Sequence, residues 1–228
     1  MRDILTAGLT ALGLDTAAAP QLERYAALLL EKNKVMNLTA ITGERDVATL
    51  HLLDCAALLA QADMRGKTVI DVGTGAGFPG MVLAILAPDA RFTLLDSLGK
   101  RVAWLEGILP ELGISAHCVT ARAEEAVASC RESFDVASSR AVARLNILLE
   151  LLAPYVRVGG YVAALKGAAA QQELDECKNA MAKLGLKLES VTHFDVEGAD
   201  HAVILLRKVA HTPGCYPRRY AKIKQSPL

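Results

Sequence analysis

The chain has 228 residues, of which 52% are hydrophobic and 22% charged, and its formal net charge is zero. This composition is typical of one large globular domain and excludes a disordered chain, and no apolar run approaches membrane-spanning length. Aromatic residues make up only 4%, so stacking platforms for single-stranded nucleic acid are scarce. Five cysteines without a C-x-x-C pair indicate reduced thiols in a cytoplasmic protein and no metal site.

Residues 1–65 are predicted to form an N-terminal helical region that packs on the rest of the chain. The apolar pattern predicts a first helix that Gly13 can end, a second from about 20 to 34, and a third after Thr42. The N-terminus lacks the basic and long apolar regions of a signal peptide.

On the third predicted helix, His51 and Asp54 lie three positions apart and therefore share one face. Two interpretations remain open. The pair could be catalytic, or it could be a surface ion pair or a latch onto the next domain. The second interpretation is the more common use of such a pair and is favoured here.

Residues 66–210 alternate between strand and helix patterns, which predicts a mostly parallel, doubly wound α/β sheet. Strands are expected at 67–72, 91–96, 115–120, 133–138, 160–166, 186–195 and 201–208, and helices at 79–87, 98–109, 123–130, 144–155 and 170–184. The last two strands have no helix between them and should form an antiparallel hairpin. A parallel sheet closed by such a hairpin is typical of Rossmann-like class I methyltransferases rather than of NAD-binding domains.

The stretch from Lys67 to Gly80 reads as a buried strand that enters a glycine-rich turn and then a helix. Its glycines permit positive φ and the close approach of a ligand: Gly73, Gly75, Gly77 and Gly80. The letters G-x-G-x-x-G allow a dinucleotide, but the carboxylate of Asp71 would repel a pyrophosphate. S-adenosylmethionine, which carries an ammonium and a sulfonium, fits better, with Asp71 accepting from the ammonium directly or through water.

The ends of the following strands offer further ligand contacts. Asp96 lies at the spacing where an acidic residue meets a ribose, and it is expected to be free for binding because Ser97 could cap the next helix. Glu124 or Glu125 is expected near the adenine edge or, alternatively, as a helix cap. Arg140 follows a buried strand without a neighbouring acid, which favours a functional role.

Residues 211–228 form a basic tail. No acidic residue follows Asp200, and two tyrosines are interleaved with the cations. The basic residues after Asp200 are Arg207, Lys208, Arg218, Arg219, Lys222 and Lys224. Three prolines argue against a helix in the tail. The pattern predicts an arm that contacts RNA phosphates and bases, with a merely solubilising tail as the alternative.

Several segments together resemble the small-subunit ribosomal RNA guanine-N7 methyltransferases, the family once named glucose-inhibited division protein B. They are NKVMNLT from Asn33, the His51-x-x-Asp54 pair, residues 71–80, LLDSLGKR from Leu94, Ser139-Arg140-Ala141, Leu165-Lys166-Gly167 and the closing PRR…SPL. The resemblance runs from about residue 20 to the C-terminus. The run LLDSLGKRV at its distance from DVGTGAGFPG is its most specific part.

The resemblance implies methyl transfer from S-adenosylmethionine to N7 of one guanine in the decoding region of 16S rRNA, nucleotide 527 in standard rRNA numbering. It implies cofactor contacts at Gly73, Gly75, Phe78, Asp96, Ala123, Glu124 and Arg140, to which the strand-end patterns add Asp71, Gly77 and Ser97. A cytoplasmic monomer is expected that acts on 16S rRNA or the small ribosomal subunit, with no membrane partner. The alternatives are a non-catalytic S-adenosylmethionine-binding RNA module and a small-molecule methyltransferase.

Guanine N7 carries a lone pair and no proton, so it needs no general base, and catalysis should consist of positioning. The catalytic candidates are Arg140, which would orient the base or cofactor, and Lys166, which would bind phosphate. The other substrate-binding candidates are Asn37, His51, Lys100, Arg101, Arg218 and Arg219. Replacing Arg140 by alanine is expected to remove most turnover and leave the fold intact.

Overall fold

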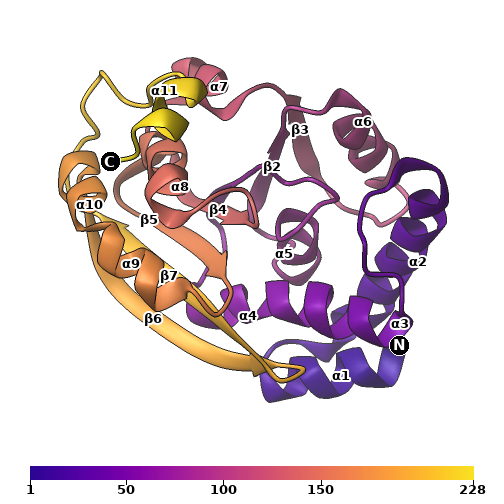
Figure 1. Ribbon diagram of the computed structural model, residues 1–228. Coiled ribbons are helices and arrows are strands. Elements are labelled where there is room, and N and C mark those ends of the chain that lie inside the picture. Colours follow the sequence, from indigo (N-terminus) through magenta and orange to yellow (C-terminus); the bar gives the residue numbers. More distant parts are fainter.

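The computed structural model describes residues 1–228 and has a central seven-stranded sheet with helices on both faces (Figure 1). The strands are β1 (Thr68–Val72), β2 (Arg91–Asp96), β3 (Ala116–Thr120), β4 (Phe134–Arg140), β5 (Val156–Lys166), β6 (Leu186–Val196) and β7 (Ala199–Lys208). Their order is β3-β2-β1-β4-β5-β7-β6, and only the pairs made by β7 are antiparallel. The predicted fold class, with its C-terminal hairpin, is confirmed.

The sheet has apolar side chains on both faces, as central parallel strands require. Successive residues of a strand point to opposite faces, so Val69 packs in one hydrophobic cluster while Ile70 packs in the other. The connecting helices that cover these faces are α5 (Gly80–Leu86), α6 (Gly99–Ile108), α7 (Ala123–Cys130), α8 (Leu145–Leu152), α9 (Ala170–Glu176) and α10 (Lys178–Leu184). Burial on both faces explains why the strand pattern is continuous rather than alternating.

Two predicted helices differ from the observed ones. The helix expected at 144–155 ends at Leu152 and continues as a 3₁₀ turn, because Pro154 has no N–H to donate to the helix. The helix expected at 170–184 is divided at Cys177, whose N–H bonds to Leu174 O in a tighter i→i+3 arrangement.

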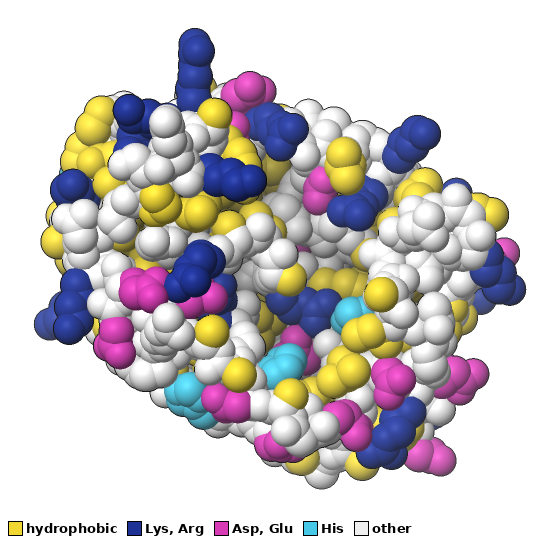
Figure 2. Space-filling model, in the orientation of Figure 1, with side chains coloured by type: hydrophobic (Ala, Val, Ile, Leu, Met, Phe, Trp, Pro, Cys, Tyr) yellow, Lys and Arg dark blue, Asp and Glu magenta, His cyan; other side chains and the backbone are white.

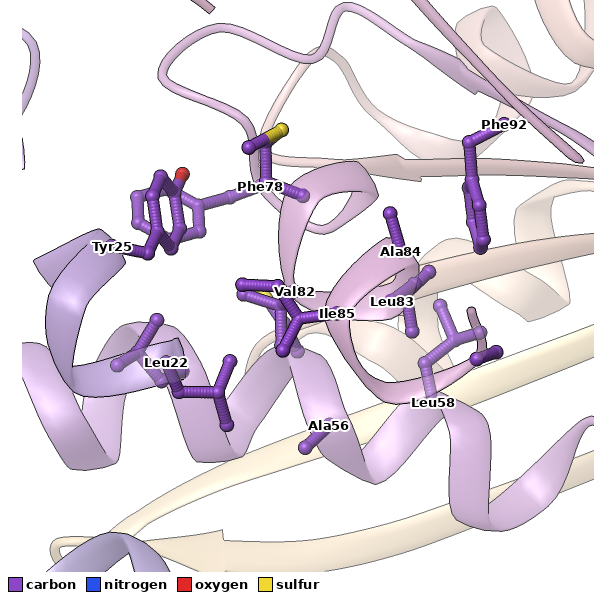
Figure 3. Close-up of a cluster of buried hydrophobic side chains, with 14 of the residues drawn as sticks. Leu22, Tyr25, Ala56, Leu58, Phe78, Val82, Leu83, Ala84, Ile85 and Phe92 are labelled. Atoms are coloured by element: carbon purple, nitrogen blue, oxygen red, sulfur yellow. The ribbon is translucent and has the colours of Figure 1, made fainter. Parts of the chain in front are cut away.

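The N-terminal helices pack on one face of the sheet. They are α1 (Arg2–Ala11), α2 (Ala19–Met36), α3 (Glu44–Asp46), the π-helical segment η2 (Val47–Leu53) and α4 (Asp54–Gln61). Figure 3 shows Leu22 of α2 and Ala56 of α4 together with Val82 and Ile85 of α5, and all four belong to one buried cluster. This packing fixes η2 and α4 beside the core strands. No helix of the structure has the length and apolarity needed to span a bilayer.

The C-terminal tail folds back on α8, where it contains the short helix α11 (Tyr220–Gln225) (Figure 1). The expectation that the prolines prevent helix in the tail is therefore wrong. Pro217 and Pro227 lie outside this helix on either side, where they remove no helical hydrogen bond. Ile223 is fully buried and anchors α11 to the core.

Candidate active site

The glycine loop connects β1 to α5 at the carboxyl end of the sheet. The N–H groups of Gly73 and Thr74 donate to Leu95 O at 2.8 and 3.0 Å, which ties the loop to the end of β2. Gly77 has φ +101°, and a Cβ there would lie 2.5 Å from Met81 Cγ and from Tyr25 Oη. The loop therefore requires glycine both for its backbone conformation and for its close packing on α2.

Asp71 is fully buried beneath the loop and does not line the cavity above it. Its carboxylate accepts from Gly80 N at 2.8 Å and from Ser138 Oγ at 3.1 Å. Burial raises the pKa of this carboxyl to about 6, against the opposing effect of these hydrogen bonds. The expected direct contact between Asp71 and a cofactor ammonium is therefore corrected, because Asp71 holds the loop in shape from below. A contact through water stays a prediction.

Asp96 lines the cavity and also shapes it. Its Oδ2 accepts from Gly75 N and its Oδ1 from Leu98 N, both at 2.8 Å. The expectation that Ser97 would cap α6 and leave Asp96 free is wrong, because no side chain caps α6 and Asp96 itself accepts the N–H just before it. Each carboxylate oxygen keeps a further lone pair, so Asp96 can still accept from ribose hydroxyls.

A cavity of about 420 Å³ lies above the ends of β1 to β4. The predicted cofactor residues that line it are Gly73, Gly75, Phe78, Asp96, Ser97, Ala123, Glu124 and Arg140. The substrate candidates His51 and Arg101 also line it, whereas Gly77 does not. The sequence did not predict Tyr220, which lies on α11 and lines the cavity. Its only signal in the sequence was its position among the basic residues of the tail.

Arg140 joins the core to the N-terminal helices. Its Nη1 donates to Asp54 Oδ2 at 2.8 Å and to Leu50 O at 2.9 Å, and its Nη2 lies 2.9 Å from His51 Nδ1. The guanidinium also stands over the ring of Phe78, with Cζ 4.9 Å from the ring centroid. The interpretation of His51 and Asp54 as a latch onto the next part of the chain is confirmed.

The hydrogen bonds of His51 define its protonation state. A guanidinium can only donate, so His51 Nδ1 accepts from Arg140 and the ring proton sits on Nε2, 2.8 Å from Thr39 Oγ1. Burial and the Arg140 charge lower the pKa of His51 to about 4. His51 is therefore neutral at physiological pH, and its ring packs on Phe78 at 4.5 Å.

A second cavity, of about 610 Å³, adjoins the first and shares His51, Arg140 and Ala141 with it. Lys166 reaches this cavity from β5, where its Nζ is 2.7 Å from Glu173 Oε2. His201 reaches it from β7. Figure 2 shows the hollowed face of the molecule, in which basic, histidine and acidic side chains lie together in the hollow.

The remaining substrate candidates are placed apart from the cavities. Asn37 ends α2 in the left-handed conformation, with φ +50°, and is exposed, as is Lys100. Arg219 is exposed beside α11. Arg218 has a structural role instead, because its backbone N–H and its Nε both donate to Glu150, whose carboxylate is fully buried.

The tail anchor includes a second buried cation. Lys208 is fully buried, and its Nζ bonds to Glu132 Oε1 at 2.9 Å and to Ala153 O at 2.7 Å. Two of the cations assigned to an RNA-binding arm, Arg218 and Lys208, are thus engaged inside the protein. Arg219, Lys222 and Lys224 remain on the surface.

Comparison with known proteins also indicates a methyltransferase. The family described as rRNA small subunit methyltransferase G matches residues 18–203. The ribosomal RNA small subunit methyltransferases G of Clostridium perfringens (strain 13) and Thermoanaerobacter pseudethanolicus are 42% and 41% identical to this chain, over 90% of it and 88% of their own length.

Solved structures share the fold. An M. jannaschii TYW2 in complex with AdoMet has a TM-score of 0.59 at 12% identity, covering 75% of this chain and 80% of its own. A SAM-dependent methyltransferase from Aquifex aeolicus has a TM-score of 0.55 at 16% identity, covering 72% and 94%. S-adenosylmethionine, expected at the glycine loop, is the cofactor of this methyltransferase class. The chain belongs to the family of rRNA small subunit methyltransferase G.

Proposed function

We propose that the protein transfers the methyl group of S-adenosylmethionine to N7 of a single guanine in the decoding region of 16S rRNA, nucleotide 527 in standard numbering. The observation that carries this proposal is the meeting of two cavities at His51, Arg140 and Ala141. The first has the glycine loop and carboxylates that suit the cofactor. The second is open to a base that has left its stack.

The residues of the first cavity fit S-adenosylmethionine. Asp96 would accept from the ribose hydroxyls, and Glu124 offers a carboxylate near the adenine. At Gly75 an added Cβ would meet nothing closer than 3.8 Å, so the backbone is open to a ligand at this point. The cofactor supplies an electrophilic methyl group on a sulfonium.

The chemistry of guanine N7 requires no proton transfer. The neutral His51, whose Nδ1 is engaged by Arg140, is not placed to act as a base, and no step needs one. The protein contributes by holding N7 in line with the methyl carbon and by excluding water. Arg140 holds the shared wall of the two cavities in place, and Lys166, beside Glu173, stands where it can contact the target nucleotide.

The exposed cations next to Tyr220 in the sequence suit an RNA backbone. Arg219, Lys222 and Lys224 are exposed and lie within four positions of Tyr220, which lines the first cavity. Lysine and arginine side chains that neutralise phosphates bind RNA without reading sequence, and this binding weakens as salt increases. The selection of one guanine must therefore come from the second cavity and from the shape of the rRNA.

The test uses methyl-labelled S-adenosylmethionine with small ribosomal subunits, or with naked 16S rRNA, from cells that lack this enzyme. Aniline cleavage then maps 7-methylguanosine. One strong cut at the proposed nucleotide is the expected result, and the better substrate shows when in assembly the protein acts. Label at another nucleotide would reject the proposed target. Cofactor binding without any label would favour the non-catalytic RNA module.

A further inference from the structure

We infer that His201 recognises the acceptor guanine, by accepting a hydrogen bond from the N1–H or amino group of the base, and that Asp54 orients it for this role. The inference rests on the proposed function. His201 lies on β7, is 23% exposed at its side chain, and lines the second cavity but not the first. It therefore faces the place of the acceptor base and not that of the cofactor.

The Asp54 contact determines which atom His201 presents. Its Nδ1 lies 2.7 Å from Asp54 Oδ1, and an ionised carboxylate can only accept, so Nδ1 carries the proton. Asp54 is itself held by Arg140 through its other oxygen. No protein atom hydrogen-bonds His201 Nε2, which in the neutral ring is an acceptor.

Guanine has a donor edge that matches this acceptor. N7 must be bare for the reaction, and O6 is an acceptor, whereas N1–H and the 2-amino group are donors on the Watson–Crick edge. The two carboxylates that line the same cavity are engaged, Asp54 by Arg140 and Glu173 by Lys166. His201 Nε2 is thus an acceptor without a protein partner, and an acceptor at this place favours a purine with N1–H over one without it.

The same hydrogen bond strengthens during the reaction. When N7 forms its bond to the methyl carbon, positive charge spreads through the purine and makes N1–H a stronger donor. An acceptor at this edge therefore stabilises the transition state more than the ground state, which raises the turnover rate. Asp54 behind the imidazole fixes the tautomer and the orientation of the ring, as carboxylates do for histidines in metal sites.

The charged and titratable groups around His201 come from each element that borders the cavity. They are His51 of η2, Asp54 of α4, Arg140 of β4, Lys166 of β5 and Glu173 of α9. Arg140 and Lys166 each have a carboxylate partner, Asp54 and Glu173.

Two substitutions of His201 separate its role in recognising the base from its structural contact with Asp54. In His201→Asn the side-chain amide can still donate to Asp54, but the acceptor at the Nε2 position is lost. In His201→Gln a polar atom is kept near Nε2, but the Asp54 contact is lost. His193→Asn is the matched control, because His193 pairs with Asp200 at 3.1 Å on the same hairpin and lines neither cavity.

The experiment measures kcat and KM on small subunits, the affinity for S-adenosylmethionine and the melting temperature. We expect His201→Asn to lower kcat roughly 100-fold, with cofactor affinity and melting temperature unchanged. His201→Gln should retain more turnover than His201→Asn. His193→Asn should behave as the wild type.

The outcomes distinguish the two proposals. If the wild type makes no 7-methylguanosine, the proposed function fails before any variant is compared. If the wild type makes it and His201→Asn turns over normally, only the inference about His201 is overturned. Equal losses in both variants, together with a lower melting temperature, would also overturn it, because they would show that the pair with Asp54 is merely structural.

Discussion

The cofactor side and the acceptor side of the site are built in different ways. The loop of the first cavity depends on residues close in the chain, from Gly73 to Asp96, whose carboxylate accepts from the loop N–H of Gly75, although Arg140 and Tyr220 also line this cavity. The second depends on Asp54, Arg140, Lys166 and His201, which come from four separate elements. A local backbone motif shapes one side, and a network of buried charges shapes the other.

This difference affects how each side responds to mutation. On the cofactor side, the backbone N–H groups of Gly73, Thr74 and Gly75 are already satisfied by Leu95 O and Asp96. On the acceptor side, the carboxylate of Asp54 is 3% exposed and depends on Arg140 and His201 for its partners. Removal of Arg140 there leaves the Asp54 charge without a compensating cation in the protein interior.

The largest effect is expected from Arg140→Ala. The substitution leaves Asp54 buried without its guanidinium, so the free energy of unfolding should fall by about 3–5 kcal/mol and turnover should be lost. The sequence predicted that the fold of Arg140→Ala stays intact, whereas the buried ion pair with Asp54 leads us to expect a loss of stability. Urea denaturation measures the change. Arg144→Ala is the control, because the Arg144–Glu176 pair is exposed and should contribute little to the free energy of unfolding. A similar cost for both variants would contradict the comparison.

A smaller effect is expected from Gly77→Ala on the cofactor side. The new Cβ would lie 2.5 Å from Met81 Cγ at a φ of +101°, so stability should fall by about 2–4 kcal/mol. Gly107→Ala provides the control, because Gly107 lies in α6 with no atom within 4 Å of an added Cβ. It should raise stability by up to about 1 kcal/mol. Thermal denaturation measures both changes. A higher melting temperature for Gly77→Ala than for Gly107→Ala would show that the loop tolerates a side chain.

The smallest effect is the change of stability with pH, to which His51 and Asp71 contribute with opposite signs. The folded pKa of His51 lies below its ordinary value, at about 4, so its contribution to stability is present at neutral pH and is lost as the pH falls from about 6.5 to 4. The folded pKa of Asp71 lies above its ordinary value, at about 6, so its contribution is present below about pH 4 and is lost as the pH rises through 6.

Melting temperatures recorded from pH 4 to 7 test this contrast. His51→Gln should flatten the acidic loss of stability, and Asp71→Asn should make that loss steeper, each by at most about 1.4 kcal/mol per pH unit. Cys118→Ala serves as a control, since the thiol does not titrate in this range: partial burial raises its pKa to about 11. The same acidic slope in His51→Gln and in the wild type would show that His51 is not the group that titrates.

Much of the cofactor side could be predicted because its determinants are local. Glycines that permit positive φ, and an acid at the end of the next strand, act on neighbours that the strand order brings to one edge. The prediction was wrong for Asp71 and for the cap at Ser97. Both errors concern which N–H a carboxylate accepts, and this depends on the final path of the loop.

By itself the sequence determined the order of strands and helices, the glycine loop and the position of Asp96, because backbone preferences and hydrophobic periodicity act over a few residues. Only the tertiary structure decided that Arg140 pairs with Asp54, that Arg218 is bound by Glu150, and that His201 reaches the second cavity. A buried charge takes whichever partner the packing of distant elements brings within hydrogen-bonding distance, and the sequence separation of the partners carries no sign of that choice.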